Sequence, residues 1–111
     1  MKLYLKPKYK EVLKFIKDFK RFESSEVLKR TFTQGYCYWF AHILHARFPK
    51  SEIVYYSAGI HFACKIYNKV FDITGDITHK NLFFESWEEY QKVEPVESEK
   101  VIKYCITKTG I

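Results

Sequence analysis

A cysteine at the predicted start of a helix stands where a nucleophile would be expected. Cys37 follows the loop residues Gln34 and Gly35 and opens a run of aromatic and apolar residues that is typical of a helix. A helix N-terminus carries about half a unit of positive charge and free N–H groups, which lower the pKa of a thiol in the first turn. The backbone N–H of Cys37 could also donate to the oxyanion that forms when its sulfur attacks a carbonyl.

A cysteine nucleophile needs a base, and the base needs a group that orients it. In the strand-like segment 60–67, alternation places Phe62 on one face and His61 on the other, beside the small residue Ala63. Asp72 interrupts the next apolar segment, where a carboxylate without a partner would be costly to bury. His61 is therefore the candidate base, and Asp72 is its candidate partner.

The register of the hairpin that joins these two segments decides which acid faces His61. A two-residue turn at residues 68–69 would place Asp76 directly opposite His61. A turn at residues 67–68 would place Asp72 on the near diagonal instead, roughly 7 to 8 Å away between backbones. Both acids have the right parity, so we prefer Asp72 and keep Asp76 as the alternative third member.

The first half of the chain has the periodicity of helices. An apolar stripe that starts after Pro7 predicts a helix to about Phe22, and serine caps predict a second helix over residues 24–32. A third helix is predicted from Cys37 until just before Pro49, because proline disfavours helical geometry in the residue ahead of it.

The second half of the chain alternates as strands do. A capping box that begins at Ser86 predicts one short helix in this half. Strands are predicted over residues 52–57, 60–67, 70–73 and 101–107. The fold class is therefore α+β, in a single domain over residues 1–111, with N-terminal helices and with the nucleophile helix packed on a small antiparallel sheet.

The net charge of +6 is concentrated near the N-terminus. The first 30 residues contain 10 Lys and Arg against 4 Asp and Glu, and the other 81 residues contain 9 against 9. Such an excess can attract nucleic acid or an acidic protein, but here it falls on the polar positions of an amphipathic helix and indicates a solvated face. Any contact with nucleic acid would use Lys10, Lys14, Lys17 and Arg21.

The cysteines and the N-terminal residues indicate a cytoplasmic protein. Cys37, Cys64 and Cys105 are odd in number and widely spaced, which does not fit a disulfide framework. The N-terminus has no apolar run that could serve as a signal peptide or membrane span, so we expect no membrane contact. Cys64 and Cys105 lie in apolar segments and are predicted to be inert core residues.

Metal binding is a further interpretation of these residue types. His42 and His45 share a helix face, but zinc sites on helices more often use four-residue spacing with a nearby acid. Cys37, His61 and Asp72 also have the ligand types of a zinc site. We nevertheless predict neither a metal nor a cofactor.

The ordered trio resembles a known superfamily. A cysteine that opens a helix, then His61 on a strand and Asp72 on the next strand, is similar to the transglutaminase-like branch of the papain-like cysteine hydrolases and acyltransferases. Residues 37–41, CYWFA, resemble its Cys-aromatic-x-Phe-Ala motif, and residues 71–74, FDIT, resemble its hydrophobic-Asp-x-Thr segment. The match covers roughly residues 34–76. The span of residues 35–75 also resembles short uncharacterised bacterial and phage proteins.

The resemblance implies a cysteine-dependent hydrolase or acyltransferase that acts on an amide or ester carbonyl of a peptide or protein. A peptidase, a deamidase and a transglutaminase are all compatible with it. The chain departs from the pattern at Ala63, where the family often has an aromatic residue, and it lacks a tryptophan upstream of Cys37. Gln34 is then the candidate oxyanion donor. The alternative is a non-catalytic binding module that uses the basic N-terminal helix and exposed aromatic residues. In that module the trio is either a remnant of an enzyme or a structural cluster.

Overall fold

The computed structural model describes residues 9–22 and 36–108. The helices of these residues are α1 (Tyr9–Phe19), η2 (Lys20–Phe22), α3 (Cys37–Arg47), η3 (Thr78–Lys80), α4 (Trp87–Val93) and α5 (Pro95–Lys108). The strands are β1 (Glu52–Tyr56), β2 (His61–Ile66), β3 (Lys69–Asp72), β4 (Gly75–Asp76) and β5 (Glu85–Ser86). The helix that was predicted over residues 24–32 lies outside the described residues.

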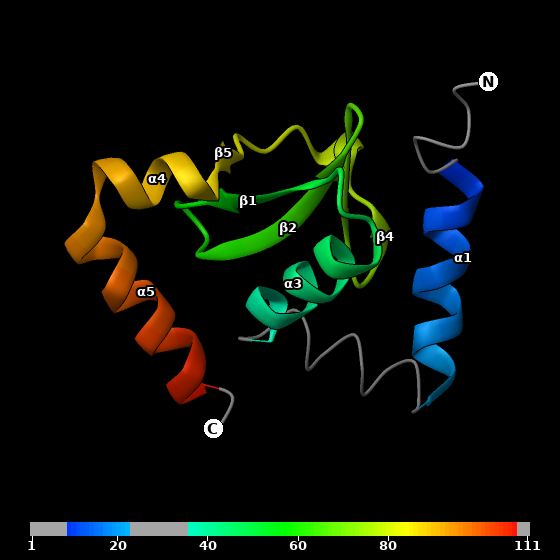
Figure 1. Ribbon diagram of the computed structural model, residues 1–111, viewed down its shortest axis with the longest axis horizontal. Coiled ribbons are helices and arrows are strands. Elements are labelled where there is room, and N and C mark those ends of the chain that lie inside the picture. The colour runs from blue at the N-terminus through cyan, green and yellow to red at the C-terminus, as the bar shows by residue number, and fades with distance from the viewer. Residues whose placement is uncertain (1–8, 23–35, 109–111) are drawn as a thin grey trace.

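The strands form one antiparallel sheet in the order β4-β3-β2-β1-β5. Helix α3 packs against β2, and the coil between η3 and β5 runs on the other side of the sheet (Figure 1). Helices and an antiparallel sheet confirm the predicted α+β class. The helix predicted to about Phe22, the nucleophile helix and the first three strands all lie where their periodicity placed them.

The face of the sheet that α3 covers, which we call the inner face, carries most of the core. Val12 and Ile16 of α1 and Phe40 and Leu44 of α3 pack there with buried side chains of β2 and β3. Nearer the start of α3, Phe62 of β2 lies in a second cluster with residues of α4 and α5. Burial of each such side chain contributes about 1.5–3 kcal/mol, so this packing fixes α3 against β2.

The opposite face of the sheet, the outer face, is covered more thinly. Val54 of β1 and Ala63 of β2 are buried there with Ile77, and Val70 and Phe84 pack against them. Phe84 belongs to the coil between η3 and β5. The alternation of β2 that was predicted from its sequence is confirmed, because Phe62 and Ala63 belong to clusters on different faces.

The turn of the β2–β3 hairpin lies at residues 67–68, as preferred, because Ile66 pairs with Lys69 across it. Tyr67 has a φ of 64°, in the left-handed region that a tight two-residue turn requires. This register continues the ladder so that Ala63 faces Asp72 across the two strands. It therefore sets Asp72, and not Asp76, diagonally beside His61.

The predicted strand over residues 101–107 is wrong, because these residues belong to the helix α5. In a strand over this range, Ile102, Tyr104 and Ile106 would share one face. In the structure Val101 and Cys105 are buried, four residues apart, and Tyr104 is exposed. That spacing is the period of a helix, which a short apolar run does not distinguish from a strand.

The helix start predicted at Ser86 is confirmed. Ser86 is the N-cap of α4, and its hydroxyl accepts a hydrogen bond from the backbone N–H of Glu89 at 3.3 Å. Such a cap stabilises a helix by about 1 kcal/mol. It begins α4 immediately after β5, which brings Trp87 into the core cluster of Phe62.

Candidate active site

Cys37 is the first residue of α3, as the sequence predicted. Its side chain is buried with Ala41 and Phe62, and the residue is only 2% exposed. The N-cap residue Tyr36 makes no side-chain capping hydrogen bond. Cys37 therefore has the position in which the partial positive charge of the helix N-terminus stabilises a thiolate.

His61 is the first residue of β2 and contacts both of its predicted partners. Its Nε2 lies 3.0 Å from Oδ2 of Asp72, within hydrogen-bond distance. The ring also makes a hydrogen bond with the side chain of Cys37. Because Nε2 is taken by Asp72, Nδ1 is the ring nitrogen left for the sulfur.

The surroundings of His61 favour its protonated form. Burial lowers the pKa of the imidazole, but the hydrogen bonds with Asp72 and Cys37 and the charges of both partners outweigh burial and raise the pKa to about 9. The side chain of His61 is 18% exposed, and that of Asp72 is 6% exposed. His61 is therefore an imidazolium at neutral pH, held between two acidic groups in a largely dry setting.

Asp72 is held by a residue that sequence reasoning did not single out. Its Oδ1 accepts hydrogen bonds from the backbone N–H of Thr74 at 2.8 Å and from the Thr74 hydroxyl at 2.5 Å. Burial alone would raise the pKa of Asp72, but the hydrogen bonds from His61 and Thr74 lower it. An Asp followed two residues later by Thr is the pattern of such a turn, so the FDIT segment contained the signal.

Asp76, the alternative third member, is engaged elsewhere. It accepts a hydrogen bond from the Tyr9 hydroxyl at 2.8 Å and one from the backbone N–H of Thr78 at 2.9 Å. It pairs with Phe71 on the far side of β3 from β2. The structure thus brings Asp72 to His61 and leaves Asp76 at the junction with α1.

The remaining candidates have other surroundings. His45 lies 2.9 Å from the Ser51 hydroxyl through Nδ1, and His42 packs its ring on Tyr38. Cys64 and Cys105 are free and buried in the core. Within residues 9–22 and 36–108, no three His, Cys, Asp or Glu side chains converge on a possible metal site. Gln34, the candidate oxyanion donor, lies outside the described residues.

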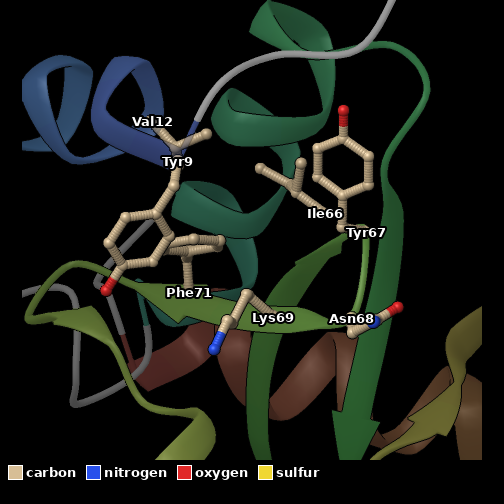
Figure 2. A pocket seen from close by; sticks show the side chains of 7 residues that line it. All are labelled: Tyr9, Val12, Ile66, Tyr67, Asn68, Lys69 and Phe71. Carbon is tan, nitrogen blue, oxygen red and sulfur yellow. The ribbon is translucent and has the colours of Figure 1, made fainter.

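A cavity of about 600 Å³ lies between α1 and the β2–β3 hairpin (Figure 2). The side chains of Tyr9 and Tyr67 flank it, and Lys69 lies at its front. It adjoins the turn end of β2, whereas His61 is at the other end, about 17 Å along the strand at 3.3 Å per residue. This cavity is therefore not part of the candidate active site.

Replacement of the two acids should separate their roles. Asp72→Asn removes the negative charge beside His61, so we expect alkylation of Cys37 by iodoacetamide at about pH 6 to slow by about tenfold, the factor that one pKa unit carries. Asp76→Asn, its matched control, should leave the rate unchanged. Mass spectrometry of the Cys37 peptide against time measures both. Equal slowing in the two variants would show that Asp72 has no special role.

The candidate site falls within the part of the chain that a protein-family sequence model matches. The model, described as phage YunG-like protein, matches residues 12–108. The chain belongs to this phage YunG-like family. The matched span contains Cys37, His61 and Asp72, and the family description names no activity. No curated protein and no solved structure matches the chain. In the described part of the chain, no helix is both long and apolar enough to cross a membrane.

Proposed function

We propose that this protein is a cysteine-dependent hydrolase or acyltransferase of the transglutaminase-like or papain-like kind, acting on an amide or ester carbonyl. The observation that carries the proposal is the position of His61. Its ring bonds the carboxylate of Asp72 through one nitrogen and also contacts the thiol that opens α3. This is the arrangement that activates a thiol nucleophile: a base beside the sulfur and an acid that orients the base.

The first half of the reaction uses the pair of Cys37 and His61. Cys37 has given its proton to His61, and its thiolate attacks the carbonyl carbon. A C–S bond forms, and one electron pair of the C=O bond moves to oxygen. The Cys37 backbone N–H at the start of α3 stabilises that oxyanion. The imidazolium then gives its proton to the leaving amine or alkoxide, whose bond to carbon breaks, and a thioester remains on Cys37.

The second half releases the acyl group. Neutral His61 takes a proton from water or from an amine, which attacks the thioester while Asp72 stabilises the new imidazolium. The C–S bond breaks, and the thiolate and imidazolium pair is restored. Water gives a peptidase or deamidase, and an amine gives a transglutaminase or another acyltransferase. The substrate is a peptide or protein.

The alternative is a non-catalytic binding module that uses the basic residues of α1 and η2. Lys14 pairs with Asp18 at 2.6 Å, and Arg21 approaches the same carboxylate at 3.7 Å. These pairs reduce the positive field that an acidic partner would meet. Of the four residues that nucleic acid would contact, the other two, Lys10 and Lys17, are exposed on α1.

Selective labelling of the three cysteines tests the proposed function. All three are almost fully buried, so access alone does not distinguish them. Burial raises the pKa of Cys64 and of Cys105 to about 11 each. Cys37 alone faces an imidazolium, so at about pH 6 iodoacetamide should label it at least about tenfold faster than the other two. Mass spectrometry of the labelled peptides gives the three rates in one sample.

The unfolded protein provides the control for this experiment. In concentrated urea the three thiols lose their surroundings and should be labelled at similar rates. If Cys37 is labelled in the folded protein no faster than Cys64 and Cys105, the nucleophile is excluded and the binding module becomes the better account.

A further inference from the structure

The ion pair of His61 and Asp72 has an aromatic neighbour on the outer face of the sheet. The ring of Phe84 lies with its centroid 6.3 Å from that of His61, at an interplanar angle of 56°. Phe84 comes from the coil between η3 and β5, more than twenty residues away in the sequence. Its contact with the ring is therefore made by tertiary structure alone.

Strand register brings Phe84 to this position. Tyr55 pairs with Glu85, so Phe84 comes next opposite Tyr56, and Tyr56 pairs with His61. Two strand spacings would separate the backbones of Phe84 and His61 by about 9.5 Å. The rings are much closer than that, so the two side chains lean toward each other across β1. Phe84 also contacts the ring of Tyr56, at 5.8 Å.

The small residue Ala63 leaves the space that Phe84 covers. Ala63 follows His61 by two residues on the outer face and faces Asp72 across the hairpin register. Phe84 packs against the cluster that contains Ala63, Val54 and Ile77. Ala63 adds little side-chain volume to this part of the outer face, and Phe84 lies over it.

We propose that Phe84 is a positioning residue that covers the His61–Asp72 pair on the outer face and keeps water from it. The ring contacts of Phe84 are with His61 and Tyr56, so it acts on the thiol through His61. An ion pair in a water-poor setting attracts more strongly than one in bulk water. The cover thus holds His61 charged and in one orientation, which in turn keeps Cys37 as a thiolate. This inference rests on the proposed function.

The groups that titrate around His61 are few among the described residues. Asp72 faces it from β3, Cys37 faces it from α3, and Tyr56 is its neighbour on β1. Phe84 adds no charge of its own. Removal of Phe84 therefore changes the solvation of these groups without removing a titrating partner.

The test compares Phe84→Ala with Phe83→Ala. Phe83 is the adjacent residue of the same coil and is 76% exposed, so it is a matched control of equal size. The measurement is the rate of Cys37 alkylation by iodoacetamide against pH, in the full chain. At about pH 6, Phe84→Ala should be about tenfold slower than the wild type, because water weakens the attraction that keeps the thiolate. At about pH 10, where a thiol ionises without help, the two rates should agree within about twofold.

Two further variants keep the test decisive. Phe84→Tyr retains the ring and should restore the wild-type pH profile. Phe84→Leu retains apolar volume without a flat ring, so its alkylation rate at about pH 6 should lie between those of the wild type and Phe84→Ala. This variant replaces Phe84→Ala in the test if Phe84→Ala does not fold. A merely structural role for Phe84 would lower the rate equally at all pH values and would also expose Cys64 and Cys105.

The outcomes separate this inference from the function on which it rests. If wild-type Cys37 is labelled selectively but Phe84→Ala and Phe84→Leu both keep its pH profile, the proposed role of Phe84 is wrong and the proposed function stands. Equal slowing of Cys37 alkylation by Phe83→Ala would also contradict the proposed role of Phe84. If wild-type Cys37 shows no selective labelling at about pH 6, the proposed function fails, and the role of Phe84 fails with it.

Discussion

Replacement of His61 by Gln should slow alkylation of Cys37 at about pH 6 by at least about a hundredfold. Gln cannot accept the thiol proton and gives no cation to face the thiolate. A thiol with the ordinary pKa of about 8.5 is ionised to roughly one part in three hundred at this pH. In the wild type, the imidazolium keeps its proton until the pH approaches the His61 pKa of about 9, so the thiolate has a charged partner throughout the acidic range.

His79→Gln is the control for this variant. His79 is exposed in η3, so its replacement by Gln makes the same chemical change away from Cys37. It should keep the wild-type rate of alkylation. The circular dichroism spectra of the two variants should match that of the wild type. A match shows that His61→Gln loses thiol reactivity and not its fold. A slowing of less than about threefold in His61→Gln would show that His61 does not activate the thiol.

Replacement of Phe62 by Ala should lower the free energy of unfolding by about 3–5 kcal/mol. Phe62 follows His61 on β2 and is fully buried. Its ring centroid lies 4.9 Å from that of Tyr38 and 4.7 Å from those of Tyr55 and Trp87. The variant loses these contacts and leaves a cavity. The total free energy of unfolding of a domain is about 5–15 kcal/mol, so this loss is a large part of it.

Urea denaturation measures this effect, with Phe83→Ala as the control. Phe83 is mostly exposed, so its truncation should change the free energy of unfolding by no more than about 0.5 kcal/mol. If Phe62→Ala does not fold, Phe62→Leu keeps most of the volume and should cost about 1–1.5 kcal/mol. A cost below about 1 kcal/mol for Phe62→Ala would mean that β2 is not fixed against α3 through Phe62.

The candidate site was predictable because its signals are local. Cys37 opens a helix that ends before Pro49, and His61 and Phe62 alternate along one strand. A two-residue turn then links Asp72 to His61 by register, so only the choice between two turns remained. Each step depends on residues that are close together in the sequence.

Other features could not be predicted because they depend on distant residues. The segment at residues 101–107 is too short for its periodicity to decide between helix and strand, and packing of Val101 and Cys105 on the Phe62 cluster favours the helix. Phe84 reaches His61 only because a strand of two residues, β5, pairs with β1. Nothing in the local sequence marks so short a strand.

The central claim is that Cys37, His61 and Asp72 act as one unit, and a double variant tests it most directly. The measurement is the rate of Cys37 alkylation at about pH 6 in His61→Gln, in Asp72→Asn and in the variant with both changes. If Asp72 acts only through His61, the double variant should be about as slow as His61→Gln alone, roughly a hundredfold below the wild type. If the two effects multiply, to roughly a thousandfold, Asp72 acts on the thiol independently of His61 and the unit does not exist.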